Sequence, residues 1–102
     1  MIPYSRGTNL KFEWDRKKAS ANAFKHRVSF DEALTVFADP LARMFDDEDH
    51  AKDEQREIII GHSARQRLLV VCFSPRADAL RIFSARRATR LERRDYEDNI
   101  QP

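Results

Sequence analysis

Five arginines lie within nine positions near the end of the chain, in the segment FSARRATRLERRDYE, and no lysine is among them. Guanidinium groups are planar, always charged and able to donate two parallel hydrogen bonds to one phosphate. The residue type and spacing therefore favour binding of a phosphate-rich ligand. The five residues are Arg86, Arg87, Arg90, Arg93 and Arg94.

The formal net charge of +2 conceals a strong asymmetry along the chain. Residues 65–94 contain nine arginines against Asp78 and Glu92, which gives +7, whereas residues 41–57 contain three basic and seven acidic residues, which gives −4. A concentrated basic surface points to nucleic acid as a partner. The acidic segment either shields that surface or forms a solvated turn.

Two pairs of arginines are candidates for contact with a phosphate backbone. Arg86 and Arg87 end a predicted strand on its opposite faces, so one of them should lie over the open face of the sheet, near a scissile phosphate. Arg65 and Arg67, at the preceding turn and strand start, would flank the same groove. If the ligand is RNA that is cut, we predict a catalytic role for Arg86 and Arg67, and RNA binding for Arg65, Arg87 and Arg90.

If the phosphate-rich ligand is RNA that the protein cuts, histidine is the natural candidate for the proton transfers. Without a metal, the reaction needs a 2′-hydroxyl that loses its proton and a 5′-oxygen that gains one. Arginine does not release a proton, whereas the pKa of histidine lies near neutrality. His26 ends a predicted helix and His62 ends a predicted strand, and both are candidates for this chemistry. The alternative for each is a capping or surface histidine.

Three further features each allow a chemical and a structural interpretation. Tyr96 is a catalytic candidate that could stack on a base or orient a phosphate, or it packs the last helix on the domain. Lys25 contacts phosphate or is an ordinary surface lysine. Arg93 and Arg94 are each followed four positions later by an acidic residue, so ion pairs on a solvated helix are their alternative.

No metal or cofactor is expected from the sequence. The acidic run 46–49 with His50 lacks the glycine that the sharp turn of a calcium loop needs, so an exposed turn is favoured. The chain has two glycines and no glycine-rich phosphate loop. Cys72, the single cysteine, lies in the apolar run LLVVCF and is predicted to be an unreactive thiol in a reducing cytoplasm.

The elements that position these residues follow from the periodicity of the chain. With 102 residues we expect one domain, comprising a loose arm over 1–9 and a folded part over 10–98. Residues 10–14 predict a strand, and Asp15 predicts a helix that runs to about His26. The capping box SFDE (29–32) predicts a second helix that ends before Pro40. Strands are predicted at 41–45, 57–62, 67–73 and 79–86, and a helix with a thin apolar face at 88–98.

The predicted fold class is α+β, with helices on one side of a mainly antiparallel sheet of four to five strands. The hairpin-length separators between the later strands are the basis for the antiparallel assignment. No apolar run approaches the length that a membrane span needs, and no secretory signal is expected.

The combination of FEWD, KHRVSF, FADPL and SARRAT…ER…YE, in that order, resembles the BrnT family of toxins over roughly residues 11–97. The resemblance implies a RelE-like fold, ribonuclease activity that arrests growth, and membership of a type II toxin–antitoxin system. It also implies neutralisation by a BrnA-type antitoxin with a ribbon-helix-helix region, in a hetero-oligomer that binds its own promoter. The arm 1–9 lies outside the matching text.

Two functions are therefore carried forward. The first is a metal-independent endoribonuclease whose basic sheet face holds RNA. The alternative is a non-enzymatic basic module that binds nucleic acid or the antitoxin and acts as a corepressor. Cutting needs groups that move protons beside the arginines, whereas binding needs only the arginines.

Overall fold

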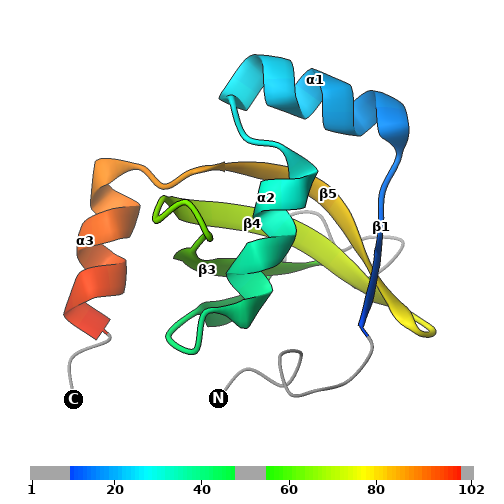
Figure 1. The fold of residues 1–102 in the computed structure, drawn as a ribbon. Helices are drawn as coiled ribbons and strands as arrows, with labels where there is room; N and C mark the ends of the chain where they lie inside the picture. The colour runs from blue at the N-terminus through cyan, green and yellow to red at the C-terminus, as the bar shows by residue number, and fades with distance from the viewer. Residues whose placement is uncertain (1–9, 48–54, 100–102) are drawn as a thin grey trace.

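The computed structural model describes residues 10–47 and 55–99, which form a five-stranded sheet with helices on both faces. The elements in chain order are β1 (Lys11–Glu13), α1 (Arg16–His26), α2 (Phe30–Leu34), the 3₁₀ helix η2 (Thr35–Ala38), β2 (Arg43–Asp46), β3 (Glu57–His62), β4 (Leu68–Arg76), β5 (Ala79–Arg87) and α3 (Arg90–Asn99). α1 and α2 lie across the sheet, and α3 stands at one end of it (Figure 1). The α+β prediction is confirmed. The arm 1–9, His50 and most of the predicted acidic turn lie outside the described residues.

The sheet is mainly antiparallel, as predicted, but it includes one parallel pair that was not predicted. The strand order is β1-β5-β4-β3-β2, and β2 to β5 pair as successive antiparallel neighbours. β1 instead pairs in parallel with β5, with Lys11 opposite Ala79. Most of the chain separates β1 from β5, so no short connecting turn indicates in the sequence that these two strands pair. Hairpin-length connections revealed only the antiparallel part.

Side-chain caps begin the first two helices where the sequence predicts them. The backbone N–H of Lys18 donates to Asp15 at 2.9 Å, and that of Glu32 donates to the Ser29 hydroxyl at 3.0 Å. These bonds satisfy backbone donors that have no partner inside the helix. The second box is only half formed, because the Glu32 carboxylate turns to other partners. The helical segment ends at Ala38, before Pro40, as predicted.

A core of aliphatic and aromatic side chains joins α1 and α2 to one face of the sheet. Phe37 packs edge-on against Phe73, with ring centroids 4.9 Å apart, and Trp14 packs edge-on against Phe30 at 5.7 Å. Burial of such side chains is the main stabilising term of a domain this size. The fully enclosed members include Val28, Val36, Ile59, Leu69, Val71, Phe73 and Ile82.

α3 lies on the opposite face of the sheet, which corrects the prediction that all helices share one side. Its anchor is Tyr96, which is 1% exposed and packs with Ile60 and Leu68. Ile60 alternates with the core residue Ile59, so the two point to opposite faces. Leu91, an apolar residue of the same helix, is instead 75% exposed. One large ring fixes this otherwise polar helix.

A complete capping box begins α3. The Glu92 N–H donates to the Thr89 hydroxyl at 3.1 Å, and the Thr89 N–H donates to the Glu92 carboxylate at 2.8 Å. The sequence pattern TRLE is the same signal that we recognised at Ser29. Among the helices of residues 10–47 and 55–99, none is long and apolar enough to cross a membrane.

Candidate functional site

The face of the sheet opposite α1 and α2 is only partly covered, and two adjoining hollows lie on it. The Tyr96 hollow, about 190 Å³, is lined by Arg43, Phe45, Ile58, Ile60, Val70, Arg86, Glu92, Asp95 and Tyr96. The Phe83 hollow, about 430 Å³, is lined by Lys18, Asp47, Arg56, Ile58, Val70, Cys72, Phe83, Ser84 and Arg86. Arg86, Ile58 and Val70 line both, so Arg86 stands at their junction.

Arg86 is the arginine that the strand alternation places over this open face, and it is held firmly. Its two terminal nitrogens each donate to a different Glu92 oxygen at 2.8 Å, and Nη1 also donates to the Arg87 carbonyl at 3.3 Å. A guanidinium has five N–H donors, of which these bonds use three. The remaining two, on Nε and Nη2, form the side-on edge of the fork. No group in the described part of the chain occupies that edge.

Glu92 orients Arg86 and caps α3 at the same time. The Arg86 guanidinium, opposed by burial and aided by hydrogen bonds from Thr89, lowers the pKa of Glu92 to about 2. Glu92 is therefore ionised at neutral pH and keeps its grip on the arginine. Arg86 itself has a pKa raised above its ordinary value, chiefly by the hydrogen bonds to Glu92. The pair presents a fixed positive edge toward the two hollows.

Tyr96 and His62, both predicted as site residues, lie together although they come from α3 and β3. Their rings meet edge-on with centroids 5.7 Å apart, and the Tyr96 hydroxyl donates to the Leu41 carbonyl at 3.3 Å. Burial and the negative charge of Asp39 raise the pKa of Tyr96. Tyr96 lines the hollow that contains Arg86, whereas His62 lines a separate one with Asp39.

Asp39 is a site residue that the sequence reasoning missed. One of its oxygens accepts from the His62 N–H at 2.7 Å and lies 3.8 Å from His62 Nδ1, and the other accepts from the Leu41 N–H at 2.9 Å. The signal in the sequence was an aspartate at a helix end before proline, which is also typical of an ordinary turn. It fixes the end of β3 beside Tyr96.

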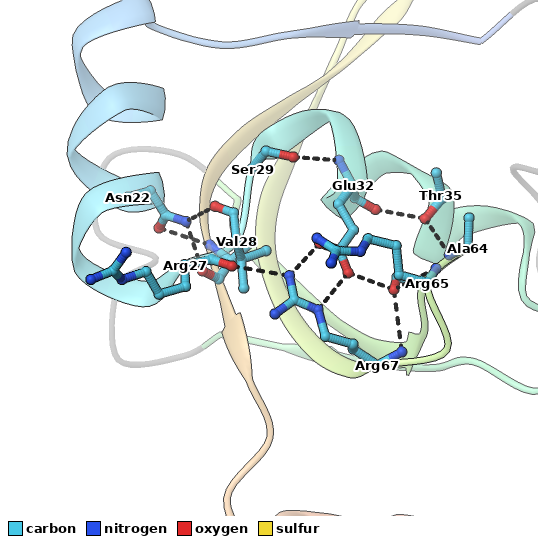
Figure 2. A network of polar contacts seen from close by, with 11 residues as sticks. Asn22, Arg27, Val28, Ser29, Glu32, Thr35, Ala64, Arg65 and Arg67 are labelled. Atoms are coloured by element: carbon cyan, nitrogen blue, oxygen red, sulfur yellow. Dashed lines mark hydrogen bonds and ion pairs between the residues drawn. The ribbon is translucent and has the colours of Figure 1, made fainter.

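Arg67, predicted as catalytic, lies in a buried polar network on the side of α2 (Figure 2). Its Nε donates to the Glu32 carboxylate at 2.9 Å, its Nη2 donates to the other Glu32 oxygen, and Nη2 also reaches the Arg27 carbonyl at 3.0 Å. The hydrogen bond from Arg67, with help from Ser63, lowers the pKa of Glu32 against the effect of burial. Arg65, 72% exposed, stands 3.8 Å from the same carboxylate.

The other predicted residues are spread over the surface and do not line either hollow. His26 is half-buried at the end of α1, and Lys25 beside it is exposed. Arg87 and Arg90 are both exposed, and Arg87 follows Arg86 in β5, so it points to the opposite face. The structure thus brings Arg86 and Tyr96 to one site and leaves these four outside it.

Two chemical features of the open face concern metals and thiols. Within 10–47 and 55–99, no three His, Cys, Asp or Glu side chains are arranged to hold a metal ion. Cys72 is half-buried in the Phe83 hollow and its thiol donates to Asp47 at 3.4 Å. Burial and the Asp47 carboxylate raise the pKa of this thiol to about 11, so it is a poor nucleophile at neutral pH.

Comparison with known proteins identifies the family to which this chain belongs. A family model described as "Ribonuclease toxin, BrnT, of type II toxin-antitoxin system" matches residues 14–92. The chain belongs to the BrnT family. No curated protein matches it. Membership places the chain among the ribonuclease toxins of type II systems, in which each toxin has an antitoxin partner.

A BrnT structure has the same architecture. The crystal structure of the Brucella abortus ribonuclease toxin BrnT is 26% identical to this chain and superposes with a TM-score of 0.62, covering 79% of this chain and 99% of the Brucella chain. The predicted resemblance to the BrnT family is therefore confirmed in both sequence and fold.

Proposed function

We propose that this BrnT-family toxin is a metal-independent endoribonuclease that acts in the cytoplasm and binds RNA across the open face of its sheet. The observation that carries the proposal is the position of Arg86 where the two hollows meet. The two N–H donors on its side-on edge make no hydrogen bond to the described part of the protein. Two parallel N–H groups match two oxygens of one phosphate. The scissile phosphate is assigned to that edge, with neighbouring nucleotides in the hollows.

The proposed reaction is attack by the 2′-oxygen on the adjacent phosphorus. The bond from phosphorus to the 5′-oxygen then breaks, which leaves a 2′,3′-cyclic phosphate and a 5′-hydroxyl. Negative charge grows on the phosphate oxygens in the transition state. The attraction between these oxygens and the preorganised Arg86 guanidinium is therefore stronger in the transition state than in the bound substrate. Loss of one such contact typically slows a reaction by roughly 100- to 1,000-fold.

Tyr96 is proposed as the proton donor to the leaving 5′-oxygen. It lines the Arg86 hollow, and like any tyrosine it is protonated at neutral pH. Its raised pKa makes it a weaker acid than an ordinary tyrosine, and its hydroxyl has to leave the Leu41 carbonyl to reach the substrate. His62, which packs on Tyr96, and His26 are the histidines proposed for proton transfer; each lies outside the two hollows. Arg67 is held by Glu32, and its assignment to catalysis stays a prediction. Lys25, Arg65, Arg87 and Arg90 are proposed to contact RNA beyond the groove.

The antitoxin is proposed to be a BrnA-type ribbon-helix-helix protein that covers the open face in a hetero-oligomer, and the complex is proposed to bind its own promoter. The face offers apolar contact at Phe45, which is 43% exposed, beside Ile58 and Val70. The cations around it favour an acidic or apolar segment of the partner. Such complementarity speeds association and weakens with salt.

The deciding assay is cleavage of RNA in the presence of a chelator, with a matched RNA that carries a 2′-deoxy group at the scissile nucleotide. We expect the first RNA to be cut to a cyclic phosphate and the second to survive. Cutting of the deoxy site, or loss of all cutting with chelator, contradicts the mechanism. Binding of RNA without any cutting supports the alternative, a non-enzymatic binding module.

Substitution of Arg86 tests the assignment of the phosphate. Arg86→Lys keeps the charge but removes the two-pronged geometry, so we expect a rate lower by on the order of 100-fold. Arg81→Lys is the control, because Arg81 pairs with Glu13 at 3.0 Å and lines neither hollow. Equal rates for the two variants would remove Arg86 from the reaction.

A further inference from the structure

The cations of residues 16–27 differ from five of the later arginines in their electrostatic partners. Five of the later arginines, Arg65, Arg67, Arg81, Arg86 and Arg93, lie within ion-pair distance of carboxylates. Residues 16–27 hold five lysines or arginines and no acidic residue. Within the described ranges, none of these five has an ion-pair partner. Among the described residues Arg87, Arg90 and Arg94 likewise have no ion-pair partner, so residues 16–27 form a second group of uncompensated cations, on and next to α1.

An aromatic ring lies among these cations on the outer side of α1. Phe24 is 82% exposed, and Lys17, Ala21 and Lys25 are exposed with it. The four residues are spaced i, i+4, i+7 and i+8, so they share one side of the helix. We call Lys17, Phe24 and Lys25 the α1 stripe. The two lysines are separated by about 12 Å along the axis.

Lys18 connects α1 to the open face of the sheet. Its ammonium lies 5.5 Å from the centre of the Phe83 ring, and the Arg56 guanidinium lies 4.1 Å from the same centre. Both cations line the hollow that ends at Arg86. A polyanion that leaves Arg86 through this hollow therefore meets Lys18 and then the rest of α1.

We propose that the α1 stripe binds single-stranded RNA that flanks the segment held on the open face. The inference rests on the proposed function and extends its substrate site beyond the two hollows. Cations that track a backbone, with an exposed ring on which a base can stack, are the features of single-strand binding. A protein partner fits less well, because the cores of protein interfaces are depleted of lysine and Phe24 stands among lysines.

The test uses RNA that cannot be cleaved. Oligomers of 2′-O-methyl RNA of about 4 and about 16 nucleotides span the range of single-strand site sizes. For the longer oligomer, Lys17→Ala with Lys25→Ala should reduce the slope of log affinity against log salt by about 1.4, at about 0.7 per charge. Phe24→Ala should weaken its binding by roughly 5- to 100-fold. The short oligomer should bind all variants alike.

The control is Lys11→Ala, which removes one exposed charge that pairs with Asp78 at 3.3 Å. It should leave the slope unchanged where Lys17→Ala alone lowers it. An unchanged slope in the stripe variants, or an equal loss on both oligomers, overturns the inference. So does loss of binding to polyglutamate with RNA binding intact, which would assign the stripe to an acidic protein. Failure of the unmodified protein to cut ordinary RNA would instead count against the proposed function alone.

Discussion

Replacement of Glu32 by glutamine should destabilise the fold far more than the same change in an exposed ion pair. The Glu32 side chain is 5% exposed and receives hydrogen bonds from Arg67 and from the Ser63 hydroxyl at 2.7 Å. Glutamine has nearly the same shape, but its amide nitrogen would face these donors. The change therefore leaves the Arg67 guanidinium, on a side chain that is 19% exposed, without its counter-charge.

The size of the destabilisation depends on the contacts that Arg67 keeps in the variant. Removing one partner of a fully buried pair costs about 3–5 kcal/mol, which is an upper bound here because Arg67 retains the Arg27 carbonyl and some solvent. We expect a loss of about 2–3 kcal/mol in the free energy of unfolding. At about 4–8 °C per kcal/mol for a domain near this size, the melting temperature should fall by about 10–20 °C.

The assay is thermal and urea unfolding of Glu32→Gln beside Glu13→Gln. Glu13 pairs with Arg81 at 3.0 Å, but the two side chains are 43% and 31% exposed, so that pair should contribute about 1 kcal/mol or less. The pKa of Glu32 is lowered below its ordinary 4.5. The stability that the ionised Glu32 contributes is therefore fully present above pH 4.5 and is lost as the pH falls through its lowered pKa. Equal losses in both variants, or a Glu32 effect that persists undiminished in acid, would refute the reasoning.

Three other perturbations have clear expected outcomes. Gly61→Ala would place a Cβ 2.7 Å from that of Ala42, so we expect about 1–3 kcal/mol of destabilisation in urea unfolding. An unchanged midpoint would mean that the backbone around Ala42 moves aside without cost. Cys72, whose pKa is raised to about 11, should resist iodoacetamide at neutral pH and react as the pH approaches that value. Mass spectrometry measures the extent of labelling, and rapid labelling at pH 7 would contradict this expectation. Tyr96→Phe keeps the ring, so it should melt close to the parent yet cut RNA roughly 100-fold more slowly, and a parental rate would remove its hydroxyl from the mechanism.

Local signals predicted most of the elements, because caps, breakers and strand periodicity act over a few residues. Asp15, Ser29 and Pro40 set the helix limits that were expected, and the segment 57–62 is a strand with the predicted ends. The pairing of β1 with β5 and the face chosen by α3 were not predictable in this way. Both depend on contacts made through the fold, and the second depends on Tyr96 together with the Arg86–Glu92 pair.

The candidate site was predicted in part for the same reason. Alternation along β5 correctly required either Arg86 or Arg87 to lie over the open face, and Arg86 does. Counting charges did not show which arginines would be ion-paired, since Glu32 and Glu92 reach their partners through the fold. Asp39 was overlooked because its sequence context is that of a common turn.

The strand order has a consequence for the time at which the toxin is completed during synthesis. β1 contains residues made early, yet its neighbour in the sheet is β5, and β5 is also the strand that delivers Arg86. Glu92, which orients that arginine, and Tyr96, which lines the hollow beside it, are made still later. Pairings between such distant segments cannot form until both have been made. A ribosome making this chain therefore carries an unassembled sheet until β5 has been made, and the Tyr96 hollow beside Arg86 is complete only once the chain has passed Tyr96.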